Sequence, residues 1–280
     1  MNKHLLKEFI ENALREDIGD GDHSSLSCIP ASATGKVQLL VKESGILAGV
    51  EVAQTIFKQV EPDIKIEQFL TDGAKIKPGD IAFTVEGSVH TLLKTERLVL
   101  NVMQRMSGIA TQTNEYVNKL KGLKTKVLDT RKTTPGMRML EKAAVKIGGG
   151  ENHRMGLYDM IMLKDNHIDF AGGIEKAILS VKKYLTEKGK DLKIEVEVRN
   201  MNELNEVLQV GGIHRIMLDN FDIPTSRKAV ELINGQYEIE SSGGITLDTL
   251  RDYAETGVDY ISVGALTHQI KSLDLSLKAL

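Results

Sequence analysis

The sequence of 280 residues has one cysteine, Cys28, and no CxxC pair. One thiol cannot form an internal disulfide, and no pair of cysteines is present to hold structural zinc. This composition is typical of proteins from a reducing compartment. The sequence also lacks any run that approaches the roughly 20 apolar residues needed to cross a bilayer. The amino terminus has no apolar core of a signal peptide, so we expect a cytoplasmic protein without a membrane partner.

The chain also has almost no excess of one charge sign, because its formal net charge is only −3. No global field therefore favours nucleic acid or an acidic membrane, and we expect no nucleic-acid partner. Hydrophobic residues make up 41% and charged residues 27% of the chain, which is an ordinary globular balance. Any site for an anion must come from a local cluster of basic residues.

Several catalytic motifs are missing. There is no G-x-S-x-G elbow and no H-E-x-x-H zinc helix, and the three glycines at 148–150 lie outside any P-loop pattern. We interpret 148–150 as a flexible or close-packed loop before His153. His153 and His167 are candidates for general acids, and the alternative for each is a hydrogen-bonded structural histidine.

The first part of the chain predicts a small α+β domain over residues 1–110. Apolar residues at helical spacing predict a first helix, which ends at the turn chemistry of 17–22. Strand-like runs follow at 36–41, 64–69 and 81–85, with a helix predicted over 50–60. A long helical pattern then covers 92–120, and Gly108 predicts a break in its middle.

The remainder, 111–269, alternates short apolar runs with helical patterns. The runs are 126–128, 160–163, 194–198, 216–218, 237–240 and 260–263, and the helical patterns are 174–185, 201–210, 224–233 and 247–256. This alternation predicts βαβ units and a parallel sheet. A doubly wound sheet is the competing arrangement. We favour a barrel because every run ends in polar or glycine residues, and about 160 residues suit six or seven strands rather than the eight of a full barrel. The tail at 270–280 is expected to pack back on the first domain.

Five basic residues lie at or just beyond two of these predicted strand ends. They are Arg131, Lys132, His153, Arg154 and Lys164. Arginine grips carboxylate or phosphate with paired hydrogen bonds, and lysine supplies a point charge. Each one alone is most simply a solvated surface charge. Together at one mouth they would repel one another unless an anion joined them, which favours a multiply anionic substrate.

Acidic and glycine residues follow the later strands. Glu195 and Glu197 are two apart in a strand and point to one face, and Asp219 ends the next strand. These carboxylates suit Mg²⁺ or a structural salt bridge to Lys132 or Lys164. The loops at 241–244 and 264–265 suit a phosphate, with Thr246 as cap of the following helix, or are ordinary tight turns.

The resemblance of this sequence to a known family says more about its function than the spacing of apolar residues does. The run DTRKTTPG at 129–136 and the run LKDNHI at 163–168 closely resemble quinolinate phosphoribosyltransferases. The likeness covers nearly the whole chain, and its other segments are 95–97, 104–111, 141–142, 148–150, 152–159, 195–198, 218–221, 240–246 and 253–267. Members of that family have an α/β amino-terminal domain beside an incomplete α/β barrel. The resemblance implies decarboxylating phosphoribosyl transfer from phosphoribosyl pyrophosphate (PRPP) to quinolinate, giving nicotinate mononucleotide for NAD biosynthesis.

The resemblance also implies roles for individual residues. The quinolinate-binding residues would be Arg97, Thr130, Arg131, Lys132, His153, Arg154 and Lys164. The residues for PRPP and phosphate would be Glu197, Asp219, Ser242, Gly243, Gly244, Val263, Gly264 and Ala265. The catalytic residues would be Lys132, Lys164, Glu197 and Asp219, of which the two acids would bind Mg²⁺ with PRPP. No organic cofactor is implied. Family members form dimers or larger multiples of dimers, so Arg97 would enter the neighbour's site.

Two other functions compete with quinolinate phosphoribosyl transfer. A divergent relative acting on another pyridine or small anionic acid would keep the PRPP residues and change the dicarboxylate clamp, which here is intact. A non-catalytic sugar-phosphate sensor or assembly protein would be favoured by loss of Lys132, Glu197 or Asp219, and all three are present.

Overall fold

The computed structural model describes residues 1–280, which form two compact units. The first unit comprises Met1–Asn114, Thr133–Gly149 and Leu266–Leu280, and the second comprises Glu115–Lys132 and Gly150–Ala265. The domain boundary predicted after residue 110 lies within the long helix α4 (Val89–Lys119). None of the helices is both long and apolar enough to cross a membrane.

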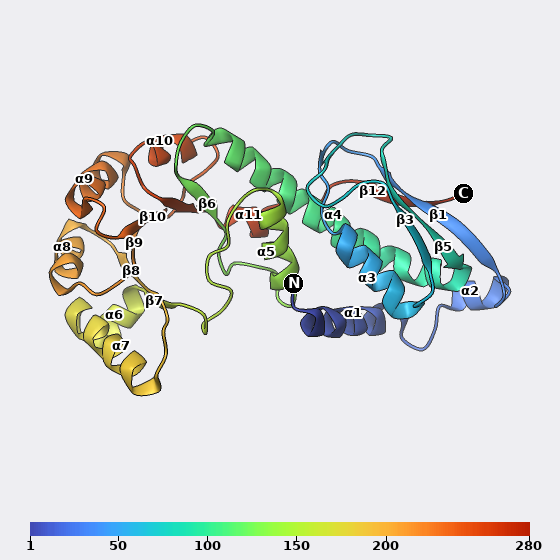
Figure 1. Ribbon diagram of the computed structural model, residues 1–280, viewed down its shortest axis with the longest axis horizontal. Coiled ribbons are helices and arrows are strands. Elements are labelled where there is room, and N and C mark those ends of the chain that lie inside the picture. Colours follow the sequence, from blue (N-terminus) through green and yellow to red (C-terminus); the bar gives the residue numbers. More distant parts are fainter. The chain divides into compact units, whose positions relative to one another are not determined.

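The first unit is an antiparallel sheet with helices packed on it (Figure 1). Its four-stranded sheet has the order β12-β1-β5-β3, and β2 pairs with β4 in a separate ladder. Besides α4, its elements are α1 (Lys3–Ile18), α2 (His23–Cys28), β1 (Thr34–Val41), β2 (Gly45–Ile46), α3 (Val50–Val60), β3 (Lys65–Gln68), β4 (Lys75–Ile76), β5 (Ile81–Ser88), α5 (Arg138–Ile147), α11 (Ala265–His268) and β12 (Leu275–Ala279). The predicted strands and the helix over 50–60 are present, so the expected α+β unit is confirmed.

The apolar stripe of α3 explains how this unit is held together. Val52, Ala53, Ile56 and Phe57 are buried, and the ring of Phe57 meets that of Phe83 on β5 edge to face at 6.4 Å. Such aromatic pairs add to the free energy gained by burying apolar area. The carboxyl-terminal strand β12 pairs with β1 along five residues, so the end of the chain completes the first sheet.

The break predicted at Gly108 was wrong, because α4 runs without interruption through this residue. The glycine has a packing role instead. A Cβ at position 108 would lie 2.3 Å from the backbone oxygen of Lys271, so only glycine allows this approach of the carboxyl-terminal segment.

The second unit is a curved, open parallel sheet with the order β6-β11-β10-β9-β8-β7. Its strands are β6 (Lys126–Leu128), β7 (Ile161–Leu163), β8 (Ile194–Val198), β9 (Arg215–Asp219), β10 (Glu238–Ser242) and β11 (Tyr260–Ser262). Its helices are α6 (Asp165–Ala171), α7 (Ile174–Lys188), α8 (Met201–Val210), α9 (Ile223–Ile233) and α10 (Leu250–Ala254). All six predicted strands are present, and the incomplete α/β barrel is confirmed. The short helices α5 and α6 were not predicted.

Helices lie outside the curved sheet of the second unit (Figure 1). Strand β8 is buried throughout, yet its residues alternate between Ile194, Val196 and Val198 on one face and Glu195 and Glu197 on the other. The aliphatic face packs under the helices, as in other βα folds. The same alternation in β9 and β10 brings charged residues inward, and this inner face positions the site.

Candidate active site

A cavity of about 160 Å³ lies at the carboxyl ends of the parallel strands. Its lining residues are Thr130, Arg131, Lys132, His153, Arg154, Met162, Lys164, Met217, Glu240, Ser242 and Ser262. This end of a parallel sheet is where βα enzymes hold their substrates. The volume lies below the roughly 300–1,000 Å³ typical of sites for drug-sized ligands, which suits a compact acid.

The five basic residues predicted to converge all line this cavity. Burial lowers the pKa of Arg154, and the positive charge of Arg131 lowers it further. The two guanidinium groups are therefore close enough to oppose each other's charge. An anion between them would relieve that repulsion, so the cavity is electrostatically suited to a carboxylate or phosphate.

The loop after β6 is held by its own polar groups. Asp129, fully buried, accepts a hydrogen bond from the backbone N–H of His153 at 2.9 Å. Thr130 Oγ1 accepts one from the backbone N–H of Lys132 at 3.0 Å. These bonds tie the two segments that carry the basic residues to one another, so Asp129 is a structural member of the predicted motif.

The predicted catalytic acids lie beside the cavity rather than among its lining residues. Glu197 Oε2 forms an ion pair with Lys164 Nζ at 2.9 Å, which is the salt bridge considered as the alternative to a metal site. Asp219 ends β9 and accepts a hydrogen bond from the side chain of Asn220 at 2.9 Å. Both carboxylates are at the carboxyl ends of adjacent strands.

The glycine loop after β10 has a steric reason for its composition. Asn220 takes a left-handed backbone conformation with φ of 55°. A Cβ on Gly243 would lie only 2.2 Å from the side-chain oxygen of Asn220, so a larger residue would clash there. Gly243 and Gly244 also have positive φ, so both suit glycine. The prediction that Thr246 caps the next helix was wrong, since α10 begins only at Leu250 and Thr246 donates its N–H to Thr249 Oγ1.

The remaining predicted residues lie outside the cavity lining. Val263, Gly264 and Ala265 follow β11, and Arg97 is exposed on α4 in the first unit. His167 has a structural role, because its Nδ1 accepts the backbone N–H of Lys164 at 3.0 Å at the start of α6.

The sequence interpretation missed Met162, Met217, Glu240 and Ser262. Met217 and Glu240 each stand two residues before a predicted site residue, Asp219 and Ser242, so strand alternation places them on the same inner face. That signal was available in the sequence once the strand boundaries were set.

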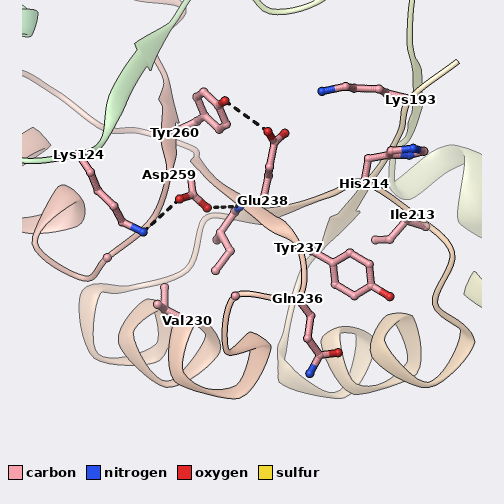
Figure 2. Close-up of a pocket in the computed structure, with 13 residues that line it drawn as sticks. Lys124, Lys193, Ile213, His214, Val230, Gln236, Tyr237, Glu238, Asp259 and Tyr260 are labelled. Carbon is pink, nitrogen blue, oxygen red and sulfur yellow. Dashed lines mark hydrogen bonds and ion pairs between the residues drawn. The ribbon is translucent and has the colours of Figure 1, made fainter.

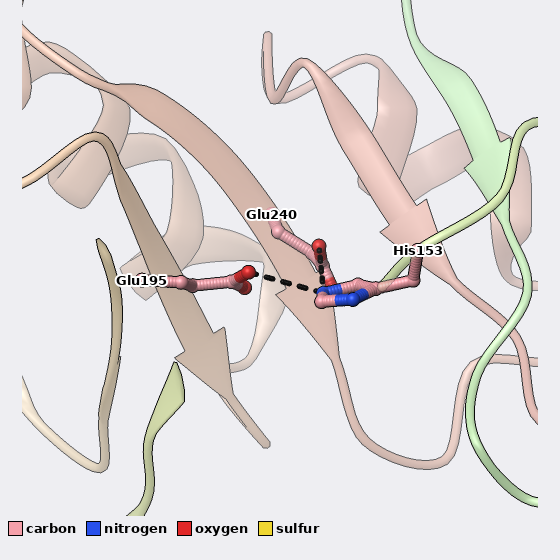
Figure 3. Close-up of side chains that lie close together, drawn as sticks. All are labelled: His153, Glu195 and Glu240. Carbon is pink, nitrogen blue, oxygen red and sulfur yellow. Dashed lines mark ion pairs between the residues drawn. The ribbon is translucent and has the colours of Figure 1, made fainter. Parts of the chain in front are cut away.

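Glu240 belongs to a buried charge cluster that we define as His153, Glu195, Arg215 and Glu240. Figure 3 shows its histidine between the two glutamates. His153 Nε2 lies 3.0 Å from Glu195 and 3.3 Å from Glu240, and both carboxylates are fully buried. Arg215 Nη1 lies 3.1 Å from Glu240 and 3.9 Å from Glu195. The imidazole and two carboxylates are close enough to hold a metal ion, but the guanidinium of Arg215 already supplies a cation to both acids.

Two members of the cluster, His153 and Glu195, bind protons more tightly than they would in water. For Glu240, burial is outweighed by the hydrogen bond and charge of His153 and by the charge of Arg215, so its pKa is lowered. Burial, the largest influence, lowers the pKa of His153, but the hydrogen bonds and charges of Glu195 and Glu240 outweigh it and raise that pKa to about 9. Burial and then the charge of Glu240 raise the pKa of Glu195 to about 7. At neutral pH the His153–Glu195 pair therefore binds more protons than a histidine and a glutamate do in water.

A larger cavity of about 620 Å³ opens at the opposite, amino ends of the strands (Figure 2). Its lining mixes Lys124, Lys193 and His214 with Glu238 and Asp259, and Lys124 pairs with Asp259 at 3.1 Å. Functional groups of βα barrels lie at the other end of the strands. We therefore assign the site to the smaller, basic cavity.

An open α/β barrel with a basic cavity at the carboxyl ends of its strands is the architecture of an α/β-barrel enzyme that binds a small polyanion. Residues 109–278 match the family model "Quinolinate phosphoribosyl transferase, C-terminal domain", and residues 22–107 match the corresponding N-terminal domain. The chain belongs to the quinolinate phosphoribosyltransferase family.

Individual relatives agree with this assignment. A quinolinate phosphoribosyltransferase [decarboxylating] of Nicotiana glauca is 46% identical over 98% of this chain and 82% of its own length. A probable nicotinate-nucleotide pyrophosphorylase [carboxylating] of Bacillus subtilis is 42% identical over 99% of this chain and 94% of its own. The crystal structure of NadC from Streptococcus pyogenes is 39% identical, has a TM-score of 0.93, and covers 100% of this chain and 99% of its own.

Because the pKa of His153 is raised in the folded protein, the free energy of unfolding depends on pH. The contribution of His153 is fully present below about pH 6.5, where the histidine is protonated in the unfolded chain as well, and it is lost as pH rises through about 9. We expect the free energy of unfolding to fall by up to ~1.4 kcal/mol per pH unit in this window. Urea unfolding at several pH values would measure it.

Glu240→Gln should flatten that slope, because it removes a charge that raises the pKa of His153. Glu231→Gln is the control, since it makes the same change at an exposed position on α9. Equal slopes for the wild type and Glu240→Gln would contradict the assignment.

Proposed function

We propose that this protein transfers the phosphoribosyl group of PRPP to quinolinate, with loss of carbon dioxide and pyrophosphate, to give nicotinate mononucleotide for NAD biosynthesis. The observation that carries the proposal is the convergence of Arg131, Lys132, Arg154 and Lys164 on one compact cavity at the carboxyl ends of the sheet. Quinolinate is a flat ring with two adjacent carboxylates, and it offers each cation a partner.

The guanidinium groups of Arg131 and Arg154 would bind the carboxylates of quinolinate. Their mutual repulsion in the free protein means that a dianion gains more there than at a neutral surface. Met162 and Met217 supply the apolar part of the lining, against which a pyridine ring can lie. Lys132 and Lys164 add positive charge without a fixed direction, where PRPP would meet the ring.

The pyridine nitrogen would attack the ribose carbon that carries pyrophosphate, so that the N–C bond forms as the C–O bond breaks. The protein's work in this step is orientation, because nucleophile and electrophile must be held near attack distance. The ribose carbon becomes electron-poor, and the carboxylate of Glu197 beside Lys164 would stabilise it electrostatically.

The glycosylated ring carries a positive nitrogen, which prepares the loss of carbon dioxide. The electron pair of the departing carboxylate stays on the carbon next to this nitrogen, where the positive charge stabilises it. That carbon then takes a proton. The lysines Lys132 and Lys164 line the cavity and supply both positive charge and N–H groups there.

Magnesium fits the acidic residues beside the cavity. Glu197 and Asp219 offer carboxylate oxygens from the ends of adjacent strands, and Mg²⁺ prefers one or two such ligands together with phosphate oxygens. When bound with PRPP, the ion would offset the charge of the departing pyrophosphate. The backbone of Ser242, Gly243 and Gly244, with Val263, Gly264 and Ala265, would hold phosphate. No organic cofactor is needed for this chemistry.

We further propose a homodimer, or a larger multiple of dimers, in which Arg97 of one subunit enters the other subunit's site. Two observations support it. Arg97 is exposed on α4, although the resemblance makes it a quinolinate-binding residue. Leu157 and Tyr158, in the segment that carries Arg154, are each 71% exposed, and Phe170 on α6 is 92% exposed. Large side chains with this degree of exposure favour burial in an interface.

A cytoplasmic location stays part of the proposal.

The reaction itself is tested by release of labelled carbon dioxide from carboxyl-labelled quinolinate. We expect release only when PRPP and Mg²⁺ are both present, and no mononucleotide when nicotinate replaces quinolinate. Absence of release from folded protein that still binds PRPP would refute quinolinate as the substrate and leave the divergent relative or the sensor.

The carboxylate clamp is tested with Arg131→Ala. Loss of a charged hydrogen-bond donor should weaken quinolinate binding by about 1.5–3 kcal/mol. Equilibrium binding of quinolinate to the variant measures it. Arg227→Ala is the matched control, because Arg227 is exposed on α9 and is not among the residues that line the cavity. Unchanged affinity in Arg131→Ala would remove this residue from the site.

The shared site is tested by mixing two inactive variants. Arg97→Ala and Lys164→Ala should each abolish activity alone. After unfolding together and refolding, a mixed dimer holds one site in which both residues are intact, so activity should return to about a quarter of the wild-type level for random pairing of equal amounts. If the mixture stays inactive while the wild type recovers under the same protocol, Arg97 does not act across an interface.

A further inference from the structure

The segment that carries His153 and Arg154 has no sheet ladder or helix to fix it. Residues 152–154 form no regular secondary structure, yet both side chains line the cavity. Their position is set by individual polar contacts. Asp129 accepts the backbone N–H of His153, the carbonyl of Met160 accepts Nη1 of Arg154 at 3.2 Å, and the imidazole of His153 reaches the buried charge cluster.

The contacts form a continuous chain from the cluster to the cavity. Nδ1 of His153 accepts the backbone N–H of Arg154 at 2.7 Å, and Nε2 faces Glu195 and Glu240. The imidazole is therefore held at both nitrogens, by the backbone at Nδ1 and by the buried carboxylates at Nε2. The orientation of the imidazole thus sets the path of the backbone into Arg154.

The two glutamates need a cation to stay where they are. Both are fully buried, and alone they would repel each other and favour protonation or movement. Arg215, from the first residue of β9, supplies that cation from the end of the sheet opposite the cavity. Its side chain is 12% exposed, and it is absent from the cavity lining.

Arg215 is itself held on three sides. Its Nε and Nη2 donate to Glu238 at 3.2 and 3.0 Å, and its Nη1 donates to Glu240 at 3.1 Å. Its guanidinium stacks over the ring of Tyr260 at 4.1 Å, and the Tyr260 hydroxyl lies 3.5 Å from Glu238 (Figure 2). Lysine cannot reproduce this arrangement, because a planar fork is needed to reach Glu238 and Glu240 together.

We propose that Arg215 is a positioning residue for quinolinate: it fixes Glu195 and Glu240, which orient His153, and His153 in turn fixes Arg154. The inference rests on the proposed function and adds to it a residue at the far end of the strands. Because the chain of contacts ends at the quinolinate clamp, its effect is specific to that substrate.

The test is Arg215→Lys, assayed by carbon dioxide release with each substrate varied in turn. We expect KM for quinolinate to rise about tenfold to a hundredfold, the scale of a displaced substrate-positioning group, while KM for PRPP stays within about twofold. Arg227→Lys, which changes an exposed arginine in the same way, should leave both KM values unchanged.

A purely structural role gives a different pattern. Partial unfolding would lower the active fraction and hence kcat, with both KM values unchanged, and that pattern overturns the proposal. Equal increases in both KM values would overturn it too. If the wild type releases no carbon dioxide, the proposed function has failed; if the wild type is active and the variant's KM for quinolinate is unchanged, only the role of Arg215 has failed.

Glu238→Gln decides the question if Arg215→Lys does not fold. Glu238 is 38% exposed, so its loss leaves the buried part of the cluster intact while weakening the hold on Arg215. A rise of about two- to threefold in KM for quinolinate alone supports the proposal, in line with loss of one partly exposed ion pair. An unchanged KM in this folded variant overturns it.

Discussion

The neutralisation of carboxylates on the inner face of the sheet is the constraint on which the second unit depends. Strand alternation directs Glu195, Glu197 and Glu240 inward, and all three are buried. An isolated buried carboxylate is very unfavourable, so each must find a cation or a proton. His153 and Arg215 serve Glu195 and Glu240, and Lys164 serves Glu197. Two of these basic groups, His153 and Lys164, also line the cavity, so they contribute both to the stability of the fold and to the charge of the site.

The balance of charge differs along the inner face of the sheet. Near the amino ends of the strands, Arg215 pairs with Glu238 and Glu240. Towards the carboxyl ends, burial and then the positive charge of Arg131 lower the pKa of Arg154. A cluster of positive charge at the mouth of the sheet suits a dicarboxylate substrate.

Much of this arrangement could be predicted from the sequence, and the limits have physical causes. The six strands of the second unit were predictable because each buried run is short and bounded by polar residues, and the basic residues of the cavity follow two of those strands. Gly108 was misread, because its reason is a backbone contact with Lys271, 163 positions further along the chain, which local helix propensity does not contain. Arg215 was missed because it stands at the amino end of a strand, where side chains of this fold are usually structural, and its partners lie on neighbouring strands.

Because the sheet is open, side chains rather than neighbouring strands fix the segment that carries His153 and Arg154. Strands β6 and β7 are the two edges, yet Arg131 after β6 and Lys164 after β7 line the same cavity, so the sheet curves until its edges face one another. The chain between them pairs with β6 at a single bridge, Leu128 to Glu151, and then continues without a ladder. A closed barrel would fix this stretch by backbone hydrogen bonds on both sides. Here side chains replace the missing strands: Asp129 and His153 fix its beginning, and Asp159 accepts the N–H groups of Met155 and Gly156 at its end. His153 and Arg154, two residues of the proposed quinolinate clamp, lie on a segment whose geometry is set by charged side chains rather than by the sheet, and this is why we propose that Arg215 positions the clamp from a distance.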